Sequence, residues 1–286
     1  MAAITNTYTR FDAKGVREDL SNVIYQISPE ETPFMSNVGR ENVTNTFFEW
    51  QTDDLAAAST TNAQIEGDDI TSFTAVTATV RLGNYTQISR KDVIIAGTLE
   101  AVDKAGRKSE KAYNLAKASS EIKRDMETSV LSNQVAANGN STTARKLGGL
   151  QAWLATNGDF GTNGVAGSLG TTARTNGTNR TFDEATLKTV IREVYAAGGN
   201  PKVLMVNPAH KQLVSAFAGI AAQRFMAPAD APTTIIGAAD VYLSDFGTIS
   251  VVPNRFMSST NSCDETAFVL DTDMASVAYL RPFQTN

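Results

Sequence analysis

Polar and apolar positions follow two different periods along the chain. Residues 47–90 are acidic and Thr-rich, and over residues 65–89 small or apolar residues alternate with Thr, which is typical of β-strands. Over residues 102–134, apolar or small residues recur at steps of four, three, four and four: Leu115, Ser119, Ile122, Met126 and Val130. That spacing is the period of one helix face. We therefore predict a long β-ribbon followed at once by one uninterrupted helix, roughly 50 Å long.

The predicted ribbon contains its own turn. Residues 66–69 combine a Gly with acidic residues and favour a turn between two arms, with residues 65–89 as the returning strand. Residues 56–63 are small, polar and flexible, as suits a hairpin tip. A long ribbon beside a long helix is hard to bury within one compact monomer. We therefore expect a subunit whose missing partners are copies of itself.

The regions on either side of the ribbon and helix have little regular pattern. Residues 1–45 suggest an extended arm with one or two short helices, because they contain too few apolar residues to fold alone. A first-turn proline predicts a short helix from Pro33 to Val38. Residues 134–180 are rich in Gly, Asn and Thr and predict loops around one buried island at residues 147–154.

The last third of the chain has the pattern of an α/β domain. A capping box of Thr181 and Glu184 opens an amphipathic helix, which the glycines at residues 198–199 end. Asn207 and Pro208 start a second helix as N-cap and first-turn residue. Strands are predicted at residues 202–206, 240–243, 248–252, 267–270 and 277–280.

Composition excludes several classes of protein. The chain has 286 residues and 42% apolar residues, which is ordinary for a globular protein with a real core. Its net charge of −5 argues against a dedicated nucleic-acid-binding protein. No apolar stretch approaches the roughly 20 residues that cross a bilayer, and no secretion signal is evident. We expect a soluble chain that needs no disulfide, because Cys263 is the single cysteine.

Candidate chemistry is scarce, and we predict no enzyme, no cofactor and no metal site. His210 is the single histidine, and we interpret it as a surface or rim residue because no partner for a proton relay is evident. The flanking residues of Cys263 suggest an inert loop thiol. Paired carboxylates such as those at residues 68–69 point apart on a strand and are usually solvated. Residues 271–273 resemble the start of a calcium loop but lack its Gly and closing Glu.

Charge is distributed unevenly between the ribbon and the helix. Over residues 47–88 the ribbon has Arg81 as its only base against a set of acids: Glu49, Asp53, Asp54, Glu66, Asp68 and Asp69. The helix has an excess of bases, among them Lys104, Arg107, Lys108 and Lys111. We predict that the two sets pair across neighbouring copies and steer assembly. The alternative is a solvated face, since one exposed pair contributes only about 0–1 kcal/mol.

Three aromatic residues open the ribbon. Phe47, Phe48 and Trp50 are candidates for anchoring the ribbon base on a neighbouring subunit, because aromatic side chains dominate desolvated contacts. An equally good interpretation places them in the core of their own subunit.

The order of these parts resembles the major capsid protein of tailed bacteriophages, with the HK-ninety-seven or Johnson fold. The local sequence is similar to one family of such subunits in four segments, at residues 27–34 (ISPEETPF), 48–53 (FEWQTD), 149–154 (GLQAWL) and 251–255 (VVPNR). The resemblance covers nearly the whole chain. It implies an α+β fold with an N-terminal arm, an extended β-hairpin loop, a peripheral domain with a spine helix, and an α/β axial domain.

The resemblance also implies a division of the chain and a set of partners. The expected parts are residues 1–45 as the arm, 46–90 as the extended loop, 91–146 as the peripheral domain, 147–246 as the axial domain and 247–286 as returning strands. Copies would form the pentamers and hexamers of an icosahedral procapsid that matures by expansion and encloses double-stranded DNA, which its inner surface contacts non-specifically. The expected partners are a separate scaffolding protein, a portal and a cement protein, with assembly in the host cytoplasm and no membrane.

Some members of this fold cross-link through a loop Lys and an Asn of a neighbour. No Lys occurs between Glu41 and Arg90, so non-covalent locking is expected here. Two other functions remain open from the sequence. An encapsulin-like compartment has the same fold but encloses enzymes. A bacterial surface or carbohydrate-binding protein would agree with the Thr-rich strands and the Asn-Gly loops.

Overall fold

The computed structural model describes residues 31–70, 72–103, 108–217, 240–281 and 283–284. The chain divides into two compact units. The first comprises Met1–Glu30 and Arg90–Ile122, and the second comprises Glu31–Ser89 and Lys123–Asn286. The described part of the first unit contains α2 (Gly97–Ala101) and the beginning of α3 (Glu110–Leu131). All other helices and strands belong to the second unit.

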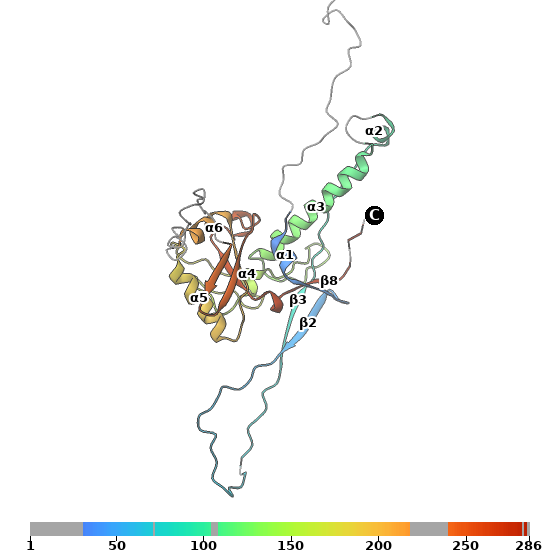
Figure 1. Cartoon of the computed structure of the whole chain (residues 1–286). Coiled ribbons are helices and arrows are strands. Elements are labelled where there is room, and N and C mark those ends of the chain that lie inside the picture. The colour runs from blue at the N-terminus through green and yellow to red at the C-terminus, as the bar shows by residue number, and fades with distance from the viewer. Residues whose placement is uncertain (1–30, 71, 104–107, 218–239, 282, 285–286) are drawn as a thin grey trace, which may run out of the picture. The chain divides into compact units, whose positions relative to one another are not determined.

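A four-stranded sheet forms the centre of the second unit, in the order β5-β6-β4-β7 (Figure 1). Its central strands β4 and β6 run parallel, and the other two pairs are antiparallel. The bounds are Val203–Val206 for β4, Val241–Ser244 for β5, Gly247–Pro253 for β6 and Ala267–Leu270 for β7. These strands confirm four of the five predicted from the last third of the sequence, to within one residue at every end.

Both faces of this sheet are covered, which explains the continuous apolar run of β4. Successive strand residues point to opposite faces. Met205 belongs to one buried cluster with Phe34 and Leu131. Leu204 belongs to a second cluster on the other face, with Ile191. Each cluster takes alternate positions of β4, so all four residues of the strand are buried.

The second cluster is covered by α5 (Glu184–Ala196) and α6 (Pro208–Ser215), which lie beside the sheet (Figure 1). The predicted start of α6 is confirmed, because the Asn207 side chain accepts a hydrogen bond from the His210 N–H at 2.7 Å. The predicted capping box of α5 is wrong. Asp183 is the N-cap and accepts from the Thr186 N–H at 2.8 Å, because Thr181 lies too far before the first turn.

Two smaller sheets contain two strands each. β1 (Gly39–Asn42) pairs in parallel with β8 (Ser276–Tyr279), so the predicted extended arm contributes a strand. It also contributes α1 (Pro33–Asn37), close to the predicted helix at residues 33–38. β2 (Phe47–Thr52) and β3 (Val80–Tyr85) form the antiparallel ribbon.

The ribbon is much shorter than predicted. The turn at Gly67 is confirmed, with a φ of +84° and a hydrogen bond from the Asp68 N–H to the Ile65 carbonyl. Residues 53–79, apart from residue 71, form neither strand nor helix (Figure 1). The prediction of a strand over residues 65–79 was therefore wrong. Thr-rich alternation favours strand geometry, but a strand also needs a partner for its backbone groups, and this segment has none in the described part of one subunit.

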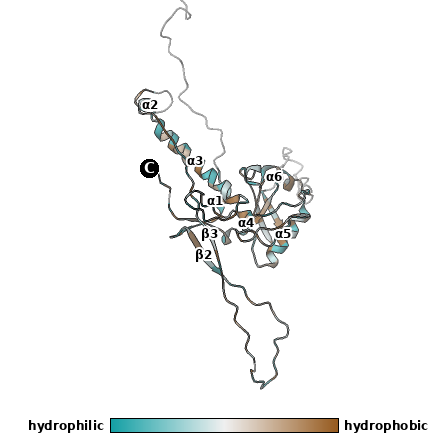
Figure 2. Cartoon of the chain, turned by 180° about the vertical axis from the view of Figure 1, so that it is seen from behind, coloured by the Kyte–Doolittle hydropathy of each residue, from teal (hydrophilic) through white to brown (hydrophobic). Residues whose placement is uncertain are grey.

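The predicted helix over residues 102–134 was also too long. Residues 102–103 are not helical, and α3 has 22 residues, about 33 Å. The Ser109 hydroxyl accepts from the Ala112 N–H at 3.1 Å and supplies the N-cap, a start signal that the periodicity obscured. The helix carries polar and apolar residues along its whole length (Figure 2). None of its five stripe residues is buried, whereas Glu127 and Leu131 are fully buried.

Candidate assembly surfaces

The base of the ribbon is fixed by aromatic contacts within the second unit. The ring of Phe47 lies 4.6 Å from that of Tyr85, and Trp50 stacks on Trp153 at 5.3 Å between centroids. Phe48 lies 5.8 Å from Trp50. These contacts lie within one subunit, but Phe47 and Phe48 are only half-buried, and none of the three aromatic residues belongs to either core cluster. Trp50 is 39% exposed, and its contact with a neighbouring copy stays a prediction.

Polar contacts that sequence reasoning missed hold the ribbon to the 147–154 island. The Asn84 side chain exchanges two hydrogen bonds with the backbone of Gly148, at 2.8 and 3.2 Å. Gly83 allows the two strands to approach closely, because a Cβ there would lie 2.6 Å from the Phe47 ring. The Gly83-Asn84 pair within a strand was the available sequence signal, but it does not identify Gly148 as the partner. The base of the ribbon is therefore fixed to the 147–154 island within the second unit.

The segment beyond this base, residues 53–79, exposes large apolar side chains to solvent. The exposed fractions of Leu55, Phe73 and Val76 are 99%, 89% and 96%, and Ile65 and Ile70 are also exposed. Single exposed apolar residues are common on proteins, but a succession along one segment marks an interaction surface.

The predicted acidic residues of this segment are exposed as well. These are Asp53, Asp54, Glu66, Asp68 and Asp69. In the part of the chain that the structure describes, no basic side chain forms an ion pair with any of the five. Glu49, at the ribbon base, forms an ion pair with Arg81 diagonally across the two strands, because its register partner is Gly83. Five solvated carboxylates beside exposed apolar groups give the segment a mixed acidic and apolar character.

The predicted basic set is only partly within the described residues. Lys104 and Arg107 lie outside them. Lys108 and Lys111 are exposed at the start of α3, and Lys117 forms an i,i+4 pair with Glu121 at 3.9 Å. Pairing of these bases with the acidic segment of a neighbouring copy stays a prediction.

A buried carboxylate forms the most constrained polar junction of the second unit. Glu127 of α3 is fully buried and accepts hydrogen bonds from the Phe34 and Met35 N–H groups at 2.7 and 3.0 Å. It also accepts from the Asn254 side chain at 2.7 Å. Burial raises the pKa of Glu127, while the three hydrogen bonds act in the opposite direction. Sequence reasoning missed this residue, because its partners lie 93 and 127 positions away.

The prediction that Cys263 is inert agrees with its surroundings. The thiol is buried and lies 3.0 Å from the Leu131 carbonyl and 2.8 Å from the Gln151 side-chain nitrogen. Burial raises its pKa to about 12. Because the thiolate is the reactive form, this cysteine is protected both by its position and by its protonation.

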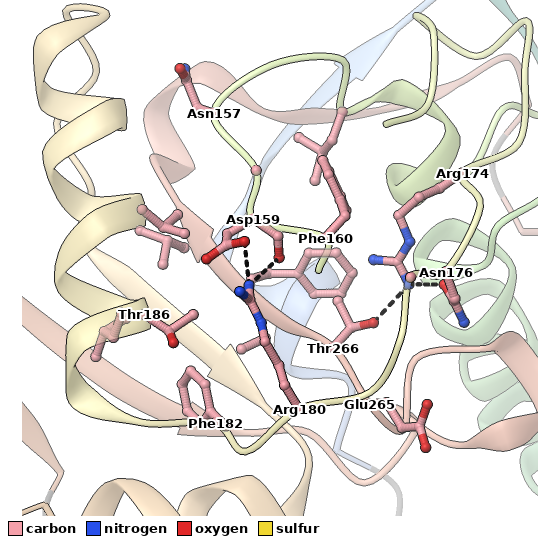
Figure 3. Close-up of a pocket in the computed structure, with 18 of the residues that line it drawn as sticks. Asn157, Asp159, Phe160, Arg174, Asn176, Arg180, Phe182, Thr186, Glu265 and Thr266 are labelled. Carbon is pink, nitrogen blue, oxygen red and sulfur yellow. Dashed lines mark hydrogen bonds and ion pairs between the residues drawn. The ribbon is translucent and has the colours of Figure 1, made fainter. Parts of the chain in front are cut away.

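A cleft of about 600 Å³ lies between α5, α6 and the loops at residues 154–180 (Figure 3). Its charged side chains have partners within the cleft wall, and Glu265 accepts a hydrogen bond from the Asn179 side chain at 2.6 Å. Arg180 pairs with Asp159, and Arg174 donates to Asn176 and Thr266 (Figure 3). His210 lines the cleft, half-buried, with its ring 5.4 Å from Phe182, which agrees with its interpretation as a rim residue.

The described residues offer no assembled chemistry for catalysis. The His210 Nδ1 atom has no hydrogen-bond partner among them. Within the same residues, no group of three or more His, Cys, Asp or Glu side chains could hold a metal ion. No helix in the described ranges is long and apolar enough to span a membrane. The notable surfaces are therefore those that could meet other protein chains.

Comparisons with known proteins place the whole chain in one family and fold. The family model described as SU10 major capsid protein matches residues 3–286. The major capsid protein of Escherichia phage Phieco32 is 32% identical over 246 residues, covering 74% of this chain and 69% of that protein. A solved chain from Mycobacterium phage Adephagia has a TM-score of 0.53 at 14% identity, covering 94% of this chain and 78% of the other. Together these matches confirm the predicted α+β capsid fold.

Proposed function

Because the chain belongs to the SU10 major capsid protein family and is a structural protein of a phage capsid shell, we propose that its copies close into an icosahedral shell around double-stranded DNA. In this proposal the exposed segment at residues 53–79 lies across a neighbouring copy. One arm and one segment per subunit make many weak contacts, which act together at high effective concentration.

The observation that carries the proposal is the contrast between the rigid base and the exposed segment of the ribbon. The base is held by aromatic and polar contacts, so the segment leaves the subunit at a defined place. Leu55, Phe73 and Val76 expose nearly all of their surface, and burying such side chains contributes roughly 1.5–3 kcal/mol each. A neighbouring copy that covers them would recover this free energy.

The same proposal assigns parts and partners. Residues 1–45 would be the arm, 91–146 the peripheral domain, 147–246 the axial domain around five-fold and quasi-six-fold centres, and 247–286 the returning strands. Assembly in the host cytoplasm would use a separate scaffolding protein, a portal and a cement protein. The shell would be locked without covalent links, because residues 42–89 contain no Lys.

The test removes the segment and keeps its base. Thr52 and Val80 are the last paired residues of the ribbon, so a short Asn-Gly turn can join them in place of residues 53–79. The shortened subunit should keep the circular dichroism and the cooperative unfolding of the intact chain. It should form no closed shells in electron micrographs, whereas the intact chain does.

A second variant keeps the length of the segment and changes only its exposed side chains. Replacing Leu55, Phe73 and Val76 together by Ser should weaken assembly to a similar degree, because the apolar contacts are lost while the reach is kept. Shells of normal size from both variants would refute the role of the segment.

A further inference from the structure

The short helix α1 lacks a cap of its own. The side chain of its N-cap residue, Thr32, makes no capping hydrogen bond, and Pro33 occupies the first turn. The following N–H groups, of Phe34 and Met35, have no partner within the helix, as is usual for a first turn. They donate instead to the two carboxylate oxygens of Glu127, one to each. A residue of α3 thus performs the capping function for α1.

The capping carboxylate is itself held from a third direction. The Asn254 side chain donates to the same Glu127 oxygen as Phe34, and the Asn254 N–H donates to the Val206 carbonyl of β4. Both Glu127 and Asn254 are fully buried. Asn254 therefore holds the Glu127 carboxylate against the central sheet independently of α1. The N–H groups of α1 bind to an acceptor that is already in position.

The length of α1 makes this acceptor decisive. Five residues are far fewer than an isolated helix needs, because nucleation fixes several residues for one hydrogen bond. Away from its seat, α1 would lose the carboxylate, and Thr32 offers no substitute in the observed geometry. Apolar burial of Phe34 and Val38 holds the segment in place, but apolar contacts do not require it to be helical.

We infer that α1 is a conditional helix, which forms only when it is seated on Glu127 and can leave that seat while the four-stranded sheet stays folded. The buried cluster that contains Met205 includes Phe34 of α1, whereas the cluster that contains Leu204 includes no residue of α1, so the sheet keeps one complete cluster when α1 leaves. Seating and helix formation are thus one two-state event, with Glu127 as the positioning residue. The consequence for assembly rests on the shell proposed above. In such a shell, copies at non-equivalent positions could differ in whether α1 is seated, and so in the direction of the chain before it.

The experiment measures amide hydrogen exchange by NMR on the unassembled full-length subunit, so its result does not depend on shell formation. Glu127→Gln keeps the side-chain volume but replaces one of the two carboxylate oxygens by an NH2 group. That donor then faces an N–H group of α1. Exchange of the amides of α1 should accelerate at least roughly tenfold, because a buried donor is left unsatisfied. The amide of Leu204 in β4 should keep its rate.

A second substitution separates capping from simple tethering. Thr32→Asp places a strong N-cap residue in α1 itself, and it should return the exchange of the Glu127→Gln protein to within about threefold of the original rate. A tether or a filled cavity would not be restored by a local cap. Glu121→Gln, half-exposed on the same helix, is the control and should change none of these rates.

Three results would overturn the inference. They are unchanged α1 exchange in Glu127→Gln, no slowing on addition of Thr32→Asp, and equal acceleration at Leu204. The last would mean that Glu127 holds the whole unit together rather than α1 alone.

Discussion

Leucine occurs in two opposite settings within the second unit. Leu204 in β4 is fully buried between strands and helices, whereas Leu55 beyond the ribbon base is 99% exposed. The sheet around Leu204 is covered on both faces by elements of the same chain, so its backbone and apolar groups are satisfied at once. The segment around Leu55 has neither a strand partner nor a cover among the described residues. The difference separates a region that the chain itself covers from a region that it leaves exposed.

The largest expected contrast between the two regions concerns thiol reactivity. In a Leu55→Cys variant, the new thiol is exposed and should have an ordinary pKa near 8.5, while burial raises the pKa of Cys263 to about 12. At pH 8 the thiolate fraction at Cys263 is then roughly a thousandfold lower. A chromogenic disulfide reagent should give one fast and one very slow phase.

The sign of the pH dependence sharpens this prediction. Raising the pH from 7 to 8 increases the thiolate fraction at both positions in parallel, so the ratio of the rates stays constant. Above about pH 9 the reaction rate of the thiol at position 55 levels off, while the rate of Cys263 still rises. The ratio of the first rate to the second therefore falls. Equal rates for both thiols at pH 8 would contradict the burial of Cys263.

The same chemical change at the two leucines should have opposite consequences. Leu204→Ala removes a fully buried side chain and should lower the free energy of unfolding by about 2–5 kcal/mol. Leu55→Ala should change it by less than about 0.5 kcal/mol, because the side chain is already in water. Urea unfolding measures both, and shell yield should fall for Leu55→Ala despite its unchanged stability. A large loss of stability in Leu55→Ala would mean that the segment packs on its own subunit.

The N-cap of α5, which packs on the four-stranded sheet, should have a smaller effect on stability than the buried leucine. Asp183→Ala removes the N-cap of α5 and should cost about 1 kcal/mol of unfolding free energy. Arg192→Ala, at an exposed position of the same helix, is the matched control and should cost little. If both substitutions had the same effect, the Asp183 hydrogen bond would have no role in stability.

The smallest expected effect per subunit concerns the acids of the extended segment. Asp68 and Asp69 are exposed, so replacing both with Lys should leave the unfolding free energy nearly unchanged. If these carboxylates meet bases of a neighbouring copy, the double substitution should slow assembly most at low salt, where charges are least screened. Light scattering at several salt concentrations measures this, and equal slowing at every salt concentration would argue against charge pairing.

Local chemistry explains where sequence reasoning succeeded. The strands of the last third were predicted because their apolar runs and flanking turns lie within a few residues of each other, and α6 because Asn207 caps it from the next position. The ribbon was predicted to extend over residues 65–79 because Thr-rich alternation is a local property as well. Whether such a strand forms depends on a partner, and the chain's own residues pair only up to Thr52 and Val80.

The amino-acid sequence by itself determined the α+β class, the short helix at Pro33, the turn at Gly67 and the resemblance to phage capsid subunits, since each depends on neighbouring residues or on short matching segments. The tertiary structure alone decided that Glu127, rather than the apolar stripe of its helix, is buried, and that it caps a helix 93 positions away. The physical reason is that a buried carboxylate is stable only where several donors converge on it, and such convergence is set by the packing of distant elements.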